Sequence, residues 1–146
     1  MHQIPDPPSK EEWAVLLRKP VRPVASLDQK SIPDQPGVYL CRRDGAAVYV
    51  GTASNLRARL WGKHLGAGLS LAGSSLRRNV GELLLGVPPA VTSSPNRVKV
   101  TSPQAEAIHS WLLSCDLAWQ ACETAAQAKL LERRLRDAYL PLLNRI

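Results

Sequence analysis

The stretch 37–51 reads GVYLCRRDGAAVYVG, and this part of the chain decides the fold. Two short apolar runs, each with one tyrosine, flank the pair Asp44-Gly45. An Asp-Gly pair between such runs is typical of a β-hairpin. The chain has only three tyrosines and no phenylalanine, so the position of Tyr39 and Tyr49 on the two arms of one hairpin needs an explanation.

The hydrophobic pattern predicts the register of this hairpin. Successive side chains of a strand point to opposite faces, so if the aliphatic residues of both arms face one core, both tyrosines point away from it. This arrangement requires a three-residue loop, 43–45, which pairs Arg42 with Ala46 and places Tyr39 directly opposite Tyr49. A cross-strand aromatic pair that only stabilises the hairpin is the alternative interpretation.

Charge points to the class of partner. The 146 residues suffice for one domain with a core, and they carry a net charge of +7. The segment 51–81 holds five basic residues and no acidic one. A field of one sign suits a polyanion such as nucleic acid, although a basic, solvated surface would give the same count.

Other classes of protein are disfavoured by composition. No apolar run approaches the roughly 20 residues that span a membrane, and the first residues lack the basic-then-apolar order of a signal peptide. We therefore expect a cytoplasmic protein with no membrane association. The three cysteines, Cys41, Cys115 and Cys122, form no C-x-x-C pair, so we interpret them as buried thiols and not as a zinc site or a disulfide framework.

The chain divides into an arm and a main domain. Seven of the 12 prolines fall in residues 1–36, which predicts a proline-rich arm over 1–35 with a short amphipathic helix around Trp13. We expect this helix to dock on the main domain, and binding of a protein partner through the arm is the alternative. Residues 36–146 form the main domain, with a helical insert over about 65–116.

The sequence pattern of the main domain predicts an α+β fold, an α/β sandwich. The expected sheet is small, three-stranded and mainly antiparallel, and helices flank it. The strands are predicted over 37–41, 47–51 and 117–122, and helices are predicted after Asn55, from Ser74 to Gly86, from Ser102 to about Ser114, and from Thr124 to about Tyr139.

Four elements in order resemble the GIY-YIG nuclease family. Gly37-Val38-Tyr39 and Tyr49-Val50-Gly51 resemble the two signature triplets, with their tyrosines ten residues apart. Arg59 follows ten residues after Tyr49, where the family has its catalytic arginine. Glu132 precedes Asn144 by twelve residues near the C-terminus, similar to the closing motif of the family. The resemblance extends over about 36–145 and implies the nuclease fold just described.

The resemblance also implies a metal ligand. Cutting a phosphodiester needs an activated water, neutralisation of charge and help for the leaving oxygen. The family uses the glutamate equivalent to Glu132 to hold one Mg²⁺ or Mn²⁺ ion, and a single carboxylate favours a one-metal site. Without the resemblance, Glu132 would be interpreted as a helix-surface residue paired with Arg136 at i+4.

The remaining catalytic candidates follow from the same motifs. Arg59 offers a fork of donors for phosphate oxygens. Tyr39 and Tyr49 are the candidates to orient or deprotonate water, and we favour Tyr49 as the base. His64 is a candidate proton shuttle. It lies one residue beyond the position at which homing endonucleases of the family have a histidine, which here is Lys63.

A second group is predicted to bind substrate. Gly51 would let the backbone approach the phosphate, Thr52 stands where the repair enzymes of the family have a lysine, and Asn144 would help order the site. Arg77 and Arg78 are expected to contact the nucleic-acid backbone without reading sequence, and a solvated helix face is the alternative. The predicted substrate-binding residues are Gly51, Thr52, Lys63, Arg77, Arg78 and Asn144.

Together these observations predict a small, metal-dependent endonuclease acting on DNA, selective for DNA structure or for single strands. Family members work in excision repair, resolution of branched DNA, homing and restriction, so DNA repair is one expected setting. A non-catalytic nucleic-acid-binding module that keeps the nuclease fold is the main alternative, and an adaptor that docks through the Trp13 helix is a third class.

Overall fold

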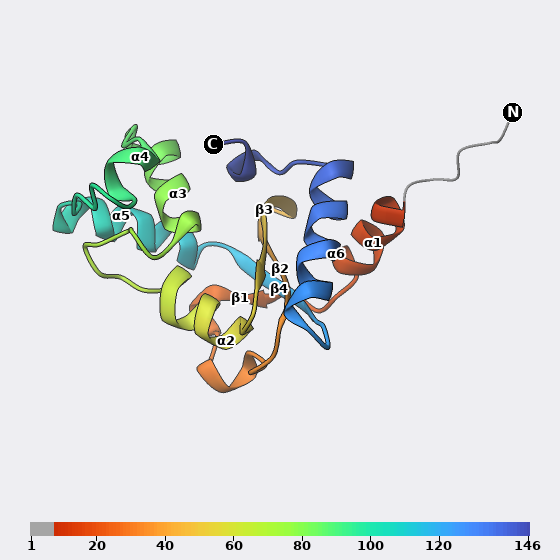
Figure 1. Cartoon of the computed structure of the whole chain (residues 1–146). Coiled ribbons are helices and arrows are strands. Elements are labelled where there is room, and N and C mark those ends of the chain that lie inside the picture. Colours follow the sequence, from red (N-terminus) through yellow and green to blue (C-terminus); the bar gives the residue numbers. More distant parts are fainter. Residues whose placement is uncertain (1–7) are drawn as a thin grey trace, which may run out of the picture.

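A four-stranded antiparallel sheet forms the centre of the protein (Figure 1). The computed structural model describes residues 8–146. The strands are β1 (Arg22–Pro23), β2 (Gly37–Arg43), β3 (Ala46–Ala53) and β4 (Asp116–Ala121), in the order β1-β4-β2-β3. The α+β class is confirmed, but the predicted number of three strands is wrong. The fourth strand, β1, comes from the arm and pairs with Leu117 and Asp116 of β4.

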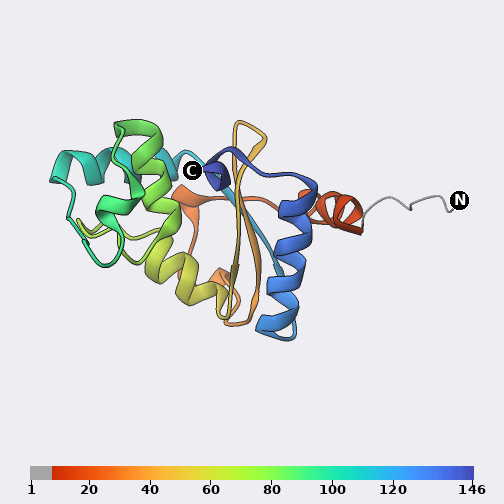
Figure 2. The same cartoon turned by 45° about the horizontal axis from the view of Figure 1, so that its top comes forward.

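Helices cover both faces of the sheet, as Figures 1 and 2 show. On one face lie α1 (Pro8–Leu17) and α6 (Ala125–Ala138). The other face carries α2 (Leu56–Arg59), the π-helical turn η3 (Leu60–His64), α3 (Ser75–Leu85) and α5 (Ser102–Leu113). The smaller elements are η1 (Val24–Ser26), η2 (Gln29–Ser31), α4 (Pro89–Thr92) and η4 (Leu142–Arg145).

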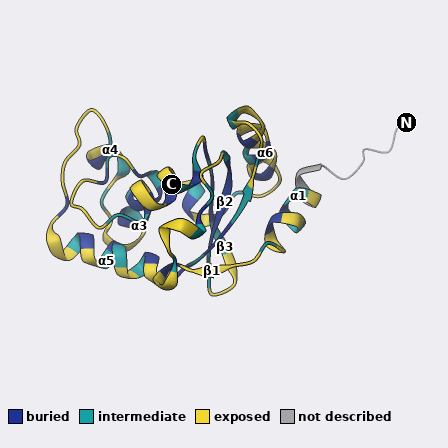
Figure 3. Ribbon diagram, turned by 90° about the horizontal axis from the view of Figure 1, so that it is seen from below, coloured by how far each residue is buried: buried dark blue, intermediate teal, exposed yellow. Residues whose placement is uncertain are grey.

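Because both faces are covered, the sheet has two hydrophobic cores, and buried residues follow its strands in Figure 3. Val38, Leu40 and Val50 pack with α1 and α6. Tyr39 and Tyr49 belong to the core on the other face. The tyrosines therefore do point away from the aliphatic core, but they enter a second core that the sequence pattern did not reveal.

The predicted register of the hairpin is wrong. The turn is the two-residue Asp44-Gly45, and both residues have positive φ angles, 52° and 79°, as a type I′ turn requires. Tyr39 pairs with Gly51, and Cys41 pairs with Tyr49. A β-bulge at Val48 inserts one residue before Tyr49, so both tyrosines share a face although they are not directly opposite each other.

Side-chain caps start the helices that surround the site. Ser74 accepts a hydrogen bond from the Arg77 N–H at the start of α3, and Gly86 closes this helix with a φ of 67°. The Thr124 side chain accepts from the Gln127 N–H at the start of α6. These helix boundaries agree with the sequence prediction.

The arm helix packs on the main domain. The Trp13 indole Nε1 donates to the Leu135 carbonyl of α6 at 2.6 Å, and Trp13 is 7% exposed. Glu12 accepts two hydrogen bonds from the Arg134 guanidinium at 2.7 and 2.9 Å. Docking on the main domain is thus the observed arrangement of α1. No helix within residues 8–146 is long and apolar enough to cross a membrane.

Candidate active site

The two hairpin tyrosines lie close to His64 on the face of the sheet that carries α2 and α3. The ring centroids of Tyr39 and Tyr49 are 6.2 Å apart, and the His64 ring lies 5.3 Å from the first and 6.2 Å from the second. The Tyr39 ring crosses β3 at Gly51, where a Cβ atom would collide with the phenol. Gly51 therefore makes room for Tyr39, and the close phosphate approach at this residue stays a prediction.

A π-helical turn brings His64 to this position. The Leu65 N–H bonds to the carbonyl of Leu60, five residues earlier, at 2.9 Å, so the turn holds one more residue than an α-helical turn. His64 follows Arg59 by five residues instead of four. The wider turn absorbs the extra residue, and His64 turns inward while Lys63 stays exposed.

A chain of hydrogen bonds runs from Tyr39 into α3. The Tyr39 hydroxyl lies 2.5 Å from His64 Nε2, and His64 Nδ1 lies 2.6 Å from the Ser74 hydroxyl. Ser74 Oγ also accepts from the Arg77 N–H at 3.1 Å. The sequence predicted Ser74 only as a helix cap, and it gave no signal that the same hydroxyl would orient a histidine.

Tyr49 has a separate partner. Its hydroxyl lies 2.7 Å from the hydroxyl of Ser75. The two tyrosines therefore differ in their surroundings, because Tyr39 contacts a group that can accept a proton and Tyr49 contacts a serine.

Burial determines the protonation states of Tyr39 and His64. Desolvation, helped by the positive charges of Arg59, Arg78 and Arg77, lowers the pKa of His64 to about 3. Burial also raises the pKa of Tyr39 well above its usual value of 10.0, and Tyr49 and Glu132 add to this while Arg59 opposes it. Tyr39 and His64 are therefore both neutral near pH 7.

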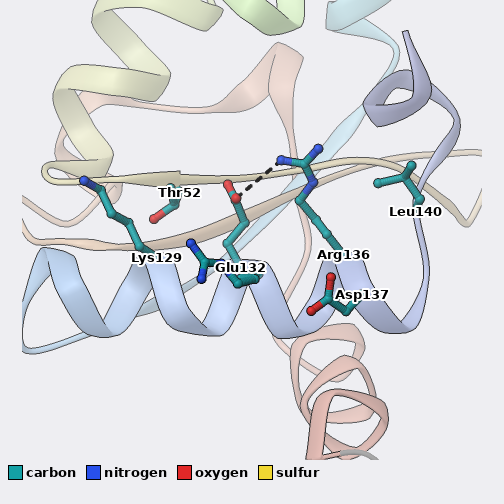
Figure 4. A pocket seen from close by; sticks show the side chains of 7 residues that line it. Thr52, Lys129, Glu132, Arg136, Asp137 and Leu140 are labelled. Atoms are coloured by element: carbon teal, nitrogen blue, oxygen red, sulfur yellow. Dashed lines mark ion pairs between the residues drawn. The ribbon is translucent and has the colours of Figure 1, made fainter.

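Glu132 lies in a groove of about 590 Å³ between α6 and β3 (Figure 4). Its side chain points toward Thr52 and forms an ion pair with Arg136 at 3.7 Å. Burial raises the pKa of Glu132 above its usual value, while Arg136 and the Thr52 backbone oppose the shift. The groove is lined by Thr52, Lys129, Glu132, Arg133, Arg136, Asp137 and Leu140.

The sequence did not predict three cations of this groove as site residues. Lys129, Arg133 and Arg136 recur at spacings of three and four along α6, which places them on neighbouring turns of one helix. We considered Arg136 only as an ion-pair partner of Glu132. Together, these three cations give the groove a positive wall, which suits a bound phosphate.

Arg59 occupies the rim of a neighbouring pocket. This pocket has a volume of about 180 Å³ and is lined by Ser54, Asn55, Ala58, Arg59 and Lys63. Within residues 8–146, no side-chain hydrogen bond or ion pair engages the guanidinium of Arg59, whereas Arg57 donates to the Ile32 carbonyl at 2.9 Å. Arg59 is thus the arginine of α2 that is available to an anion.

Three predicted substrate-binding residues use their polar atoms inside the protein. Arg77 donates to the carbonyls of Ser70 and Gly68, and Arg78 donates to two carbonyls of the same loop, 65–74. Asn144 accepts from the Val50 N–H and donates to the Val50 carbonyl, both at 2.8 Å. This exchange holds the C-terminal turn η4 against the free edge of β3.

Comparison with known proteins identifies the family of this chain. The family model described as the GIY-YIG catalytic domain matches residues 14–145. The chain belongs to the GIY-YIG family. No curated protein matches the chain. The GIY-YIG catalytic domain is a nuclease domain, and it extends here over nearly the whole sequence, including the last four residues of helix α1 in the predicted arm.

Proposed function

We propose that the protein is a divalent-metal-dependent endonuclease that hydrolyses DNA phosphodiester bonds. The observation that carries this proposal is the hydrogen-bonded pair of Tyr39 and His64, because it joins a candidate water-binding phenol to a proton acceptor at 2.5 Å. Tyr49, Arg59 and Glu132 all act on the pKa of the Tyr39 phenol, so these four motif residues lie in one neighbourhood.

The Tyr39–His64 pair is the proposed general base. A phenol with a raised pKa does not ionise at pH 7, so it must lose its proton as it takes one from water. The acceptor is His64 Nε2, which requires the tautomer with a proton on Nδ1 donated to Ser74. This geometry favours Tyr39 as the base over Tyr49, which we preferred from sequence.

Substrate binding would improve the proton acceptor. The pKa of His64 is low partly because three arginines repel a proton on the ring. A phosphate bound near Arg59 would neutralise some of that charge and raise the pKa of His64. The pair would therefore become a better base when the substrate is present.

Arg59 is the proposed ligand of the scissile phosphate. Its free guanidinium can donate two parallel hydrogen bonds to phosphate oxygens, an interaction that strengthens as charge develops. The positive wall of Lys129 and Arg133 would guide the strand along the Glu132 groove.

The Glu132 groove fits one Mg²⁺ or Mn²⁺ ion. It offers a partly buried carboxylate beside the backbone of Thr52, with open volume for further oxygen ligands. Mg²⁺ commonly binds through one or two carboxylates together with phosphate and water. A cation bound there would neutralise phosphate charge and assist departure of the 3′ oxygen. Glu132 would have to leave Arg136 to hold it.

Selectivity for DNA structure or for single strands is part of the proposal. The family model covers nearly the whole chain, which leaves little of the described chain for a separate sequence-reading domain. Arg77 and Arg78 of α3 donate to loop carbonyls. The cations of the Glu132 groove can contact phosphates, and phosphate contacts carry no sequence information.

The alternative is a binding module that keeps the fold without catalysis. It predicts equal binding with or without metal and no strand cleavage. The test is to incubate labelled single-stranded, duplex and branched DNA with the protein, once with Mn²⁺ or Mg²⁺ and once with chelator. We expect metal-dependent cuts in single-stranded or branched DNA. Equal cutting of many unrelated duplexes would contradict the selectivity, and binding without cleavage would contradict the enzyme.

A further inference from the structure

A second basic pocket lies beside the candidate active site. It has a volume of about 310 Å³ and contains the cations Lys63, Arg77 and Arg97, with no acidic residue in its lining. Four glycines leave it open, because they add no side chains to its wall: Gly62, Gly66, Gly68 and Gly73. The sequence prediction did not include Arg97 in any site.

Arg77 is the buried cation of this pocket. The residue is 3% exposed, and its two terminal nitrogens donate to the carbonyls of Ser70 and Gly68. Within residues 8–146 its Nε has no hydrogen-bond partner and no carboxylate pairs with the guanidinium. Burial lowers its pKa. Burying a charge without a counter-charge is costly, so this residue points to an anion that completes the pocket.

Arg97 and Lys63 add two exposed cations. Arg97 has a positive φ of 51°, a conformation that is uncommon for residues other than glycine. Within the described chain its side chain makes no hydrogen bond or ion pair. Lys63 lies across Gly73, with its Nζ 3.7 Å from the position that a Cβ would take there. A Cβ at Gly73 would therefore be in van der Waals contact with the Lys63 side chain.

The pocket is connected to the candidate active site in two ways. Lys63 lines both this pocket and the pocket of Arg59. Ser74 lines it too and hydrogen-bonds to His64, so two hydrogen bonds and one imidazole ring separate it from the Tyr39 hydroxyl. The loop 65–74 and the segment around Arg97 lie on the face of the sheet opposite α6 (Figure 2) and are joined by the Val100 N–H and the Leu69 carbonyl.

We propose that Lys63, Arg77 and Arg97 form a second phosphate-binding subsite for the nucleic-acid strand whose scissile phosphate lies at Arg59. The proposal rests on the nuclease function proposed above. The subsite would fix the register of the strand without reading its sequence.

The test uses Arg97→Asn, because asparagine tolerates a positive φ while it removes the charge. Lys99→Asn is the matched control: it makes the same charge change two residues away, is exposed, and lies outside the pocket. Binding of labelled single strands of two to about 15 nucleotides is measured in chelator at several salt concentrations. Thermal unfolding establishes that both variants fold.

We expect Arg97→Asn to weaken binding of the longer strands about 5- to 10-fold at low salt and to reduce the salt slope by about 0.7. The dinucleotide, which is too short to reach both subsites, should bind both proteins equally. Lys99→Asn should stay within about twofold of the wild type. Equal losses in the two variants, or a loss that does not depend on strand length, would overturn the subsite.

Inorganic phosphate distinguishes a strand from a free anion. If the pocket holds a phosphate of the strand, inorganic phosphate should displace the longer strands more than chloride does at the same ionic strength, and Arg97→Asn should abolish the difference. Binding of inorganic phosphate that is lost in Arg97→Asn, while strand binding is the same in both proteins, would assign the pocket to free phosphate and overturn the proposal. Because these measurements contain no divalent metal, they stand whether or not the wild type cleaves. A failure of the nuclease proposal would appear only in the cleavage experiment.

Discussion

The Tyr39 hydroxyl and His64 Nε2 lie 2.5 Å apart inside the protein, although the residues are 25 positions apart in the chain. Tyr39 comes from the central strand β2, and His64 ends the π-helical turn η3. Leu60 and His64 of this turn are buried, whereas Lys63 is exposed. The site therefore includes one irregular turn, a feature often found at functional positions.

This contact predicts that the two residues act as one unit. Tyr39→Phe and His64→Gln should each lower the single-turnover rate of strand cleavage by about 10²- to 10⁴-fold, as loss of general-base catalysis does. The double variant should be no slower than the slower single variant, because either change already breaks the relay. Binding measured in chelator should change little. Losses that multiply in the double variant would show that the residues act independently.

The buried histidine predicts a pH-dependent stability. The pKa of His64 is about 3 in the folded protein, against an ordinary value of 6.5 for an exposed histidine, so the unfolded chain binds a proton more readily between these values. The stability that His64 contributes is complete above about pH 6.5 and falls as the pH drops toward 3. We expect a loss of ~2 kcal/mol between pH 7 and pH 5 from this residue alone.

Denaturant unfolding at pH 7 and pH 5 measures this loss. His64→Gln should be less stable at pH 7 but should lack that part of the pH dependence. Identical pH dependence in wild type and variant would contradict a neutral, buried His64.

The approach of Tyr39 to β3 predicts that Gly51 tolerates no side chain. A Cβ at this position would overlap the phenol ring of Tyr39. Gly51→Ala should therefore lower the free energy of unfolding by about 1–3 kcal/mol and displace the catalytic phenol. Gly62→Ala is the matched control, since a Cβ there meets no atom within 4 Å. Thermal unfolding of both variants is the measurement, and equal stability would exclude the close approach.

The pairing of Asn144 with Val50 predicts a structural role for this residue. Asn144→Ala removes two hydrogen bonds of 2.8 Å from the edge of β3, and each contributes about 0.5–1.5 kcal/mol. We expect a destabilisation of about 1–3 kcal/mol in denaturant unfolding. Asn96→Ala removes one exposed hydrogen bond of 3.1 Å, to the Ala90 carbonyl, and should cost less, about 0.5 kcal/mol. Unchanged stability in Asn144→Ala would favour a direct contact with substrate instead.

Local signals in the sequence predicted much of the fold. The Asp44-Gly45 turn, the caps at Ser74 and Thr124 and the glycine at 86 each act over a few neighbouring residues, and the structure has all of them. The class of fold and the family follow from these elements together with the spacing of the motifs.

Features that depend on tertiary packing escaped the prediction. Strand β1 has two residues, one of them Pro23, and carries no alternating pattern. The sequence did not predict the bulge at Val48, because valine fits either face of a strand. The π-helical turn at His64 leaves no periodic signal in so short a segment. The inward use of Arg77 and Arg78 depends on a loop whose path only the structure reveals.

The measurement that tests the account most directly compares cleavage and binding by wild type and Glu132→Gln on the same labelled single strand. It is made at pH 8 with Mn²⁺ or Mg²⁺, so that a carboxylate with a raised pKa is ionised. We predict that the wild type cuts, and that the variant binds within about threefold but cuts at least about 10²-fold more slowly. Equal cleavage by both proteins, or binding without cleavage by both, would contradict a metal-dependent nuclease centred on Glu132.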